Sequence, residues 1–125
     1  VLAINCAVHG VLPGSGLTFL KIANKCKNDI FQDALQEPFK QIMNNSGLDV
    51  NVIEEEIINN NFQKLFNVNT NNYEDVKNTL VLDPYEVVTN SLINATSIAG
   101  MLLTTTSLVI NEYSNNIKNN DFNEL

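Results

Sequence analysis

The stretch Asp83-Pro84-Tyr85-Glu86 is the clearest helix start in the sequence, and it decides the class of fold that we predict. We expect Asp83 to cap the helix, Pro84 to occupy its first position and Glu86 to complete a capping box. The apolar residues that follow recur at helical spacing, and one face comprises Val88, Leu92, Ala95, Ala99 and Leu102. Its small side chains would let another helix approach closely. The sequence therefore predicts a mainly α fold.

Upstream of this helix, the same periodicity predicts further helices joined by short turns. They are expected over residues 1–9, 17–27, 28–45 and 49–58, with a turn over residues 11–16. Asn28 or Asp29 can cap the third of these helices, and Asp49 can cap the fourth. Pro38 lies inside the third helical pattern, where it predicts a kink or a break.

The remaining segments are less helical. Residues 59–79 favour a short β-hairpin or an ordered loop, with a turn at Asn71-Asn72. Ser107 to Ile110 is compatible with a short strand, and residues 112–125 with a polar, flexible tail. We therefore predict one domain over residues 1–111.

Composition excludes several classes of function. The net charge of −7 argues against nucleic acid or an anionic membrane as the main partner. Two cysteines, Cys6 and Cys26, provide no disulfide framework of the kind found in small secreted domains. No apolar run is expected to reach the roughly 20 residues that span a bilayer. The longest candidate, Ser97 to Ile110, is interrupted by Gly100 and by threonines.

The sequence lacks the motifs that are typical of a self-contained enzyme. The single histidine, His9, has no partner at metal-ligand spacing, so we predict no metal site. No nucleophile motif with a matching base occurs, and no Gly-Lys-Ser/Thr phosphate loop. We therefore predict no catalytic residue in this chain.

Two features could serve a nucleotide. The Gly14-Ser15-Gly16 turn precedes a helix, where free backbone N–H groups can face an anion or a ribose. The Asp83 carboxylate could accept hydrogen bonds from ribose hydroxyls. Each has a plain structural alternative, a helix junction for the turn and an N-cap for Asp83.

Five segments together resemble, in order and approximate spacing, the equatorial domain of group I chaperonins, the GroEL or sixty-kilodalton heat-shock family. The resemblance covers roughly residues 8–111. Val81-Leu82-Asp83-Pro84 matches the family's Ile-Leu-Asp-Pro, and residues 99–105 match its Ala-Gly-Leu-Met-Ile-Thr-Thr. Residues 10–16 resemble the Gly-Val-Val-Ala-Gly-Gly-Gly turn, residues 34–42 the Ala-Pro-Leu-Arg-Gln-Ile helix, and residues 66–70 the Tyr-Asn-Ala-Ala-Thr loop.

This resemblance implies the C-terminal part of the ATP-binding equatorial domain, mainly α with a small β stem-loop near residues 61–73 and a short C-terminal strand. It also implies ATP with Mg as the cofactor of the parent protein. By motif, Gly14 and Ser15 would approach the nucleotide through backbone groups, and Asp83 would hold the ribose. The adenine would be surrounded by Phe66, Asn67, Val68 and Asn69, with Val81 packed on it.

The chain departs from the family pattern at Ser15, where the family has glycine, at Phe66, where it has tyrosine, and at Asn69, where it has alanine. The family's phosphate loop and its hydrolytic aspartate are not in this chain, and neither are the domains that contact polypeptide clients and the co-chaperonin. We therefore expect a fragment that binds ATP weakly or not at all, does not hydrolyse it, and self-associates through apolar surface.

Two functions remain open at this point. The first is a segment of an ATP-dependent chaperonin that assists folding in a homo-oligomeric double ring. The second is a chaperonin-derived helical scaffold or interaction domain without nucleotide binding. The asparagine-rich tracts lead us to expect an organelle, mitochondrion or plastid, and otherwise the cytoplasm of a bacterium.

Overall fold

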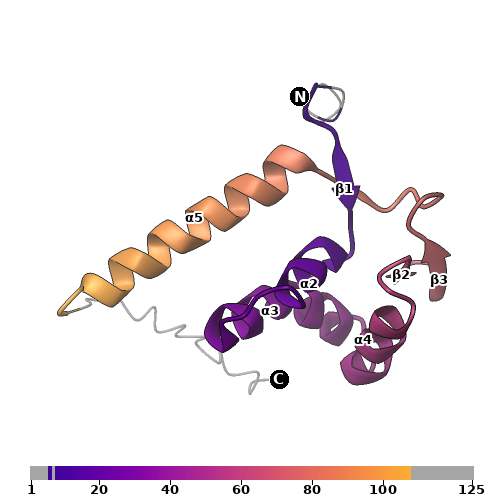
Figure 1. The fold of residues 1–125 in the computed structure, drawn as a ribbon, viewed down its shortest axis with the longest axis horizontal. Helices are drawn as coiled ribbons and strands as arrows, with labels where there is room; N and C mark the ends of the chain where they lie inside the picture. Colours follow the sequence, from indigo (N-terminus) through magenta and orange to yellow (C-terminus); the bar gives the residue numbers. More distant parts are fainter. Residues whose placement is uncertain (1–5, 7, 108–125) are drawn as a thin grey trace, which may run out of the picture.

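The computed structural model describes residues 6 and 8–107 of the chain. Its elements, in chain order, are β1 (Val11–Pro13), α2 (Leu17–Ala23), α3 (Asp29–Asn45), α4 (Val50–Asn59), β2 (Lys64–Asn67), β3 (Asn72–Asp75), β4 (Leu82–Pro84) and α5 (Tyr85–Thr104). Helices α2, α3 and α4 lie together with the β2–β3 hairpin beside α4, whereas α5 extends away from them (Figure 1). The prediction of a mainly α fold is confirmed.

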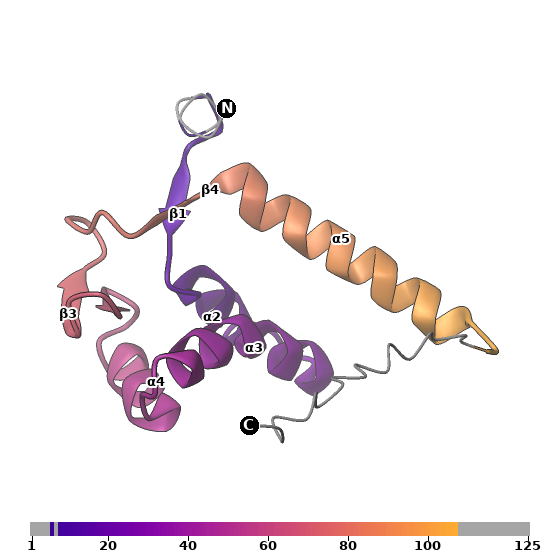
Figure 2. The ribbon, with the colours of Figure 1, turned by 180° about the vertical axis from the view of Figure 1, so that it is seen from behind.

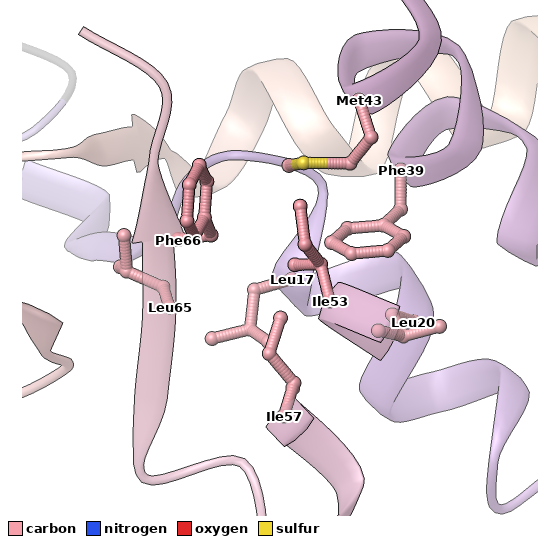
Figure 3. Packing of buried hydrophobic residues seen from close by; sticks show 8 residues of the cluster. All are labelled: Leu17, Leu20, Phe39, Met43, Ile53, Ile57, Leu65 and Phe66. Carbon is pink, nitrogen blue, oxygen red and sulfur yellow. The ribbon is translucent and has the colours of Figure 1, made fainter. Parts of the chain in front are cut away.

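The core lies where α2, α3, α4 and β2 meet. Figure 3 shows the side chains that converge there, which are Leu17, Leu20, Phe39, Met43, Ile53, Ile57, Leu65 and Phe66. Each helix contributes residues from one face only, as its amphipathic pattern predicts. The core therefore packs α2, which follows the turn at residues 14–16, against strand β2 of the hairpin.

Two of the predicted helix caps are confirmed. The Asn28 side chain accepts hydrogen bonds from the backbone N–H groups of Ile30 and Phe31, so it caps α3. The Asp49 side chain accepts from the N–H of Asn51 and caps α4. These caps satisfy amide groups that the first turn of a helix leaves without partners.

Helices α3 and α2 each differ from the prediction. Helix α3 is continuous through Pro38, so of the predicted kink or break the break is wrong, and the kink stays a prediction. Phe39 and Met43 bury the turns after the proline, and this packing offsets the one hydrogen bond that proline cannot make. Helix α2 ends at Ala23 rather than near residue 27, in a turn closed by the Cys26 N–H and the Ala23 carbonyl.

The hairpin over residues 59–79 is confirmed. Strand β2 pairs with β3 in antiparallel register, from Lys64 opposite Asp75 to Asn67 opposite Asn72. Asn71 lies at the turn with a φ of 54°, a conformation that asparagine tolerates better than most residues.

A second strand pair was not predicted. Val11–Pro13, expected as part of a turn, forms β1 and pairs with β4, so that Leu12 lies opposite Asp83. Figure 2 shows the two short strands crossing beside the start of α5. The expectation of a turn over residues 11–13 was wrong, because a strand pairing between distant segments leaves no local pattern to read.

Asp83 does not cap α5, which corrects the prediction. The residue belongs to β4, the N-cap of α5 is Pro84, and no side chain caps this helix. Pairing with Leu12 holds the Asp83 backbone extended within the strand, so the helix begins one residue later than its capping pattern suggests. The expected capping-box partner, Glu86, instead lies 3.0 Å from Nε2 of His9.

Helix α5 is exposed along most of its length. Of its predicted inward face only Val88 is buried, and Leu102 is 55% exposed. By length and composition alone the 20-residue helix could cross a membrane, because an 18-residue window within it has a mean hydropathy of 1.3. The expectation that no apolar segment reaches that length is therefore wrong by this criterion, which core helices of soluble proteins also meet.

Few of the predictions made for the two ends of the chain can be compared with the structure. Val8 and His9 are helical and Gly10 has a φ of 84°, which agrees with a helix that ends at Gly10. The cysteines Cys6 and Cys26 are free. The predicted strand from Ser107 to Ile110 and the tail over residues 112–125 lie outside the described residues, apart from Ser107, which belongs to no strand.

Candidate functional site

Gly14 joins the turn before α2 to the segment before β4. Its N–H donates a hydrogen bond of 2.9 Å to the carbonyl of Val81, and its own carbonyl accepts from the Leu17 N–H at 3.1 Å. A Cβ atom at this position would lie 3.1 Å from both Cγ1 and the carbonyl oxygen of Val81. Gly14 therefore permits a backbone approach that a side chain would obstruct.

Ser15 joins the same turn to the hairpin. Its hydroxyl donates a hydrogen bond of 2.9 Å to the carbonyl of Phe66 in β2. Its φ is 57°, in the left-handed region that glycine would adopt without strain. The turn therefore keeps a glycine-like backbone at the position where the sequence has serine.

The hairpin residues are held by their own network. Phe66 is buried and packs edge-to-face on Tyr73, with ring centroids 5.0 Å apart. The Asn67 side chain accepts a hydrogen bond of 3.0 Å from the N–H of Asn69 and donates one to the Glu74 carboxylate. The Asn67 side chain therefore stabilises the hairpin turn through hydrogen bonds within the hairpin.

Glu74 connects the hairpin to the segment before β4. Its carboxylate accepts a hydrogen bond of 2.7 Å from the hydroxyl of Thr79, and that hydroxyl accepts one of 3.1 Å from the N–H of Val81. The hydrogen bonds from Thr79 and then Asn67 lower the pKa of Glu74. The network thus ties Val81 to the hairpin.

The sequence analysis did not identify Glu74 or Thr79. Neither residue belongs to a recognisable motif, and the contact depends on the register that places Glu74 opposite Leu65. An acidic residue in a short strand followed five positions later by a threonine is too common a pattern to indicate this pair.

Asp83 is the candidate residue with unused bonding capacity. It is half-buried in β4, and its carboxylate makes no hydrogen bond within the described part of the chain. Burial raises the pKa of Asp83. A partly desolvated carboxylate with no hydrogen-bond partner among the described residues is able to accept hydrogen bonds from the hydroxyl groups of a ligand.

The structure brings most of the predicted residues to one place. Gly14 and Ser15 are bonded directly to Val81 and Phe66, and the β1–β4 pair sets Asp83 beside them. The remaining predicted residues belong to the hairpin turn, where Val68 packs against the core and Asn67 and Asn69 form the turn itself. Asn69 is exposed.

The candidate site contains apolar side chains on one segment and the Asp83 carboxylate two residues along the chain from Val81. Val68 and Val81 are partly buried and pack against the core that includes Phe66. Among the described residues, no group of three or more His, Cys, Asp or Glu side chains could hold a metal ion. The chemical group that this region offers to a ligand is the Asp83 carboxylate, which can accept hydrogen bonds from hydroxyl groups.

A separate apolar groove of about 470 Å³ lies between β1, α2 and the start of α5. Its lining includes Leu17, Phe19 and Val88, with Lys21 and Lys25 also contributing. None of the eight predicted site residues lines this groove.

Comparison with known proteins identifies relatives of the chain. A model of the TCP-1/cpn60 chaperonin family matches residues 17–112. Chaperonin GroEL 1 of Prochlorococcus marinus strain MIT 9215 is 40% identical over 110 residues, covering 78% of this chain and 19% of the relative. The protein of the same name from strain MIT 9301 is 38% identical with the same coverage.

A solved structure supports the same relationship at the level of the fold. The crystal structure of a group III chaperonin in the open state matches with a TM-score of 0.68 and 24% identity, over 84% of this chain and 25% of that one. The chain spans about a fifth of the length of the curated relatives that it matches. From the family match over residues 17–112, we conclude that this chain belongs to the TCP-1/cpn60 chaperonin family.

Proposed function

We propose that this chain forms the adenine and ribose side of the nucleotide site in an ATP-dependent group I chaperonin. The observation that carries the proposal is the convergence of three distant segments: the turn at Gly14 and Ser15, the hairpin at Phe66, and the strand that holds Asp83. In this arrangement Asp83 accepts hydrogen bonds from ribose hydroxyls, while Val81 and the hairpin contact the base.

The phosphate and metal end of the site would come from outside this chain. The described residues contain no metal-binding cluster of acidic side chains, histidines or cysteines, so Mg would be held by the phosphates and by other parts of a longer polypeptide. The proposed division makes this chain a binding element that does not hydrolyse ATP by itself.

The wider role follows from the family and is part of the same proposal. The parent protein would form a homo-oligomeric double ring, assist the folding of polypeptide clients and act with a co-chaperonin through domains outside this chain. The asparagine-rich composition leads us to propose an organelle, mitochondrion or plastid, with a bacterial cytoplasm as the alternative.

One observation favours a second function, a scaffold that no longer binds nucleotide. Several polar groups at the site already have partners within the protein: the Gly14 N–H, the Ser15 hydroxyl and the Asn67 side chain. A ligand would therefore depend heavily on Asp83.

Asp83→Ala tests the choice between these functions. In the longest natural polypeptide that contains this chain, the substitution should weaken ATP binding about tenfold or more, because a hydrogen bond to a charged group contributes about 1.5–3 kcal/mol. Asp49→Ala is the matched control, since it removes a carboxylate that caps α4 away from the site. Asp83 caps no helix, so its loss costs no cap.

The measurement is a nucleotide titration by calorimetry alongside thermal unfolding. Absence of ATP binding by the unsubstituted protein would favour the scaffold, and equal ATP affinity in the Asp83→Ala and Asp49→Ala proteins would show that Asp83 does not hold the ribose. ATP turnover by the purified chain that survives Asp83→Ala would contradict the proposal that this chain lacks catalytic function.

A further inference from the structure

Ser15 is held in a conformation that a serine does not adopt without support. Its φ of 57° lies in the left-handed region, where a side chain raises the backbone energy. Such strain persists only where surrounding contacts determine it. The contact here is the hydrogen bond of 2.9 Å from the Ser15 hydroxyl to the Phe66 carbonyl, which crosses from the turn to the hairpin.

This hydrogen bond supplements the link on the other side of the turn. Gly14 bonds to Val81 in the segment before β4, and Ser15 bonds to Phe66 in β2. A glycine at position 15 would keep the first link and lose the second, because it has no hydroxyl. The serine therefore couples the hairpin to the turn in a way that the backbone alone does not.

We propose that Ser15 is a positioning residue that fixes the hairpin at one distance from the turn and from Asp83, so that the adenine side of the site is formed before a nucleotide arrives. This rests on the nucleotide-binding role proposed above. The hydroxyl acts through the Phe66 carbonyl and has no need to touch the ligand. Forming the site in advance lowers the ordering cost of binding.

The test compares Ser15→Gly with Ser15→Ala in the longest natural polypeptide that contains this chain. Both substitutions remove the hydrogen bond, but only glycine also removes the backbone strain. Ser46→Ala is the matched control, because it deletes a serine hydroxyl that donates to the Ile42 carbonyl at 2.9 Å at the exposed end of α3.

Hydrogen exchange of the hairpin amides, residues 64–75, measures the coupling between the hairpin and the turn without any ligand. Loss of one typical hydrogen bond should speed exchange there about fivefold in both Ser15 variants and not in Ser46→Ala. Affinity for ATP with Mg should fall about three- to tenfold in both Ser15 variants. In Ser15→Gly the unfolding midpoint should stay near that of the unchanged protein, because relief of strain offsets the lost bond.

The two readouts separate the possible failures. Unchanged hairpin exchange in Ser15→Gly would overturn the coupling. Faster exchange with unchanged ATP affinity would overturn the positioning role. If the unchanged protein binds no ATP, the proposed nucleotide site fails and the positioning role fails with it, while the coupling itself is still decided by the exchange rates.

Discussion

Gly16 is the position where the structure most strongly restricts the choice of residue. Its φ is +72°, and a Cβ atom there would lie 2.7 Å from Cα and 3.0 Å from the backbone nitrogen of Phe39. The clash is with the backbone of α3, which cannot turn aside as a flexible side chain can. Gly16→Ala therefore forces α2 and α3 apart at the centre of the core.

The magnitude follows from two separable costs. An alanine in the left-handed region costs about 1–2 kcal/mol. Overpacking a well-filled core costs about 1–3 kcal/mol more. The free energy of unfolding should therefore fall by about 2–5 kcal/mol, a large part of the 5–15 kcal/mol typical of a whole domain.

Two other glycines in the same chain provide matched controls. Gly47 has a φ of +70° but no atom within 4 Å of an added Cβ, so Gly47→Ala isolates the backbone cost. Gly100 lies inside α5 with the same open surroundings, so Gly100→Ala should stabilise the helix by about 1 kcal/mol. Urea unfolding followed by far-UV circular dichroism measures all three. The reasoning is refuted if Gly16→Ala costs no more than Gly47→Ala.

Asn28→Ala should lower the free energy of unfolding by about 1 kcal/mol, because the α3 cap is lost; thermal unfolding should show that Asn28→Asp retains most of the stability. Hydrogen bonds lower the folded-state pKa of Glu74 below its ordinary value of 4.5. The ionised carboxylate therefore stabilises the fold at a pH above 4.5, and this contribution is lost as the pH falls through the folded-state pKa. Glu74→Gln should therefore destabilise at neutral pH and make little difference in acid, and a difference independent of pH would contradict this. The exposed apolar side chains of α5 should cause concentration-dependent association. Sedimentation should show that Met101→Ser with Leu103→Ser reduces it, whereas a strictly monomeric unsubstituted chain would count against the idea.

The features that could be predicted from the sequence are those with local causes. Asn28 and Asp49 cap helices because a short polar side chain can reach amides two or three residues ahead. The spacing of Phe39 and Met43 places both on one face of α3, and both are buried. The hairpin turn at Asn71 also has a local cause, because asparagine tolerates the positive φ that the turn requires.

What could not be predicted depends on contacts between distant segments. The pairing of Leu12 with Asp83 is set by tertiary structure, and it overrides a strong capping pattern. The links from Thr79 to Glu74 and from Ser15 to Phe66 likewise require the folded arrangement of turn and hairpin. At the site, therefore, residue types could be anticipated by resemblance, while their bonding partners could not.

Asp83 provides the sharpest separation between the two proposed functions. The fold leaves α5 without a side-chain cap and keeps a half-buried carboxylate without a partner among the described residues.

Burial raises the folded-state pKa of Asp83, because the ionised carboxylate is less well solvated there. The free energy of unfolding therefore falls as the pH rises from the unfolded-state pKa of Asp83 through its folded-state pKa. Asp83→Asn should therefore stabilise the chain at neutral pH, with the gain disappearing in acid. In the parent protein the same substitution should weaken ATP binding, because an amide is a poorer acceptor for ribose hydroxyls than a carboxylate. Stability and affinity then change in opposite directions, as expected for a group retained for a ligand. If Asp83→Asn stabilises the protein and leaves ATP binding unchanged, the carboxylate does not hold the ribose; if the unsubstituted protein binds no ATP, the scaffold is the better description.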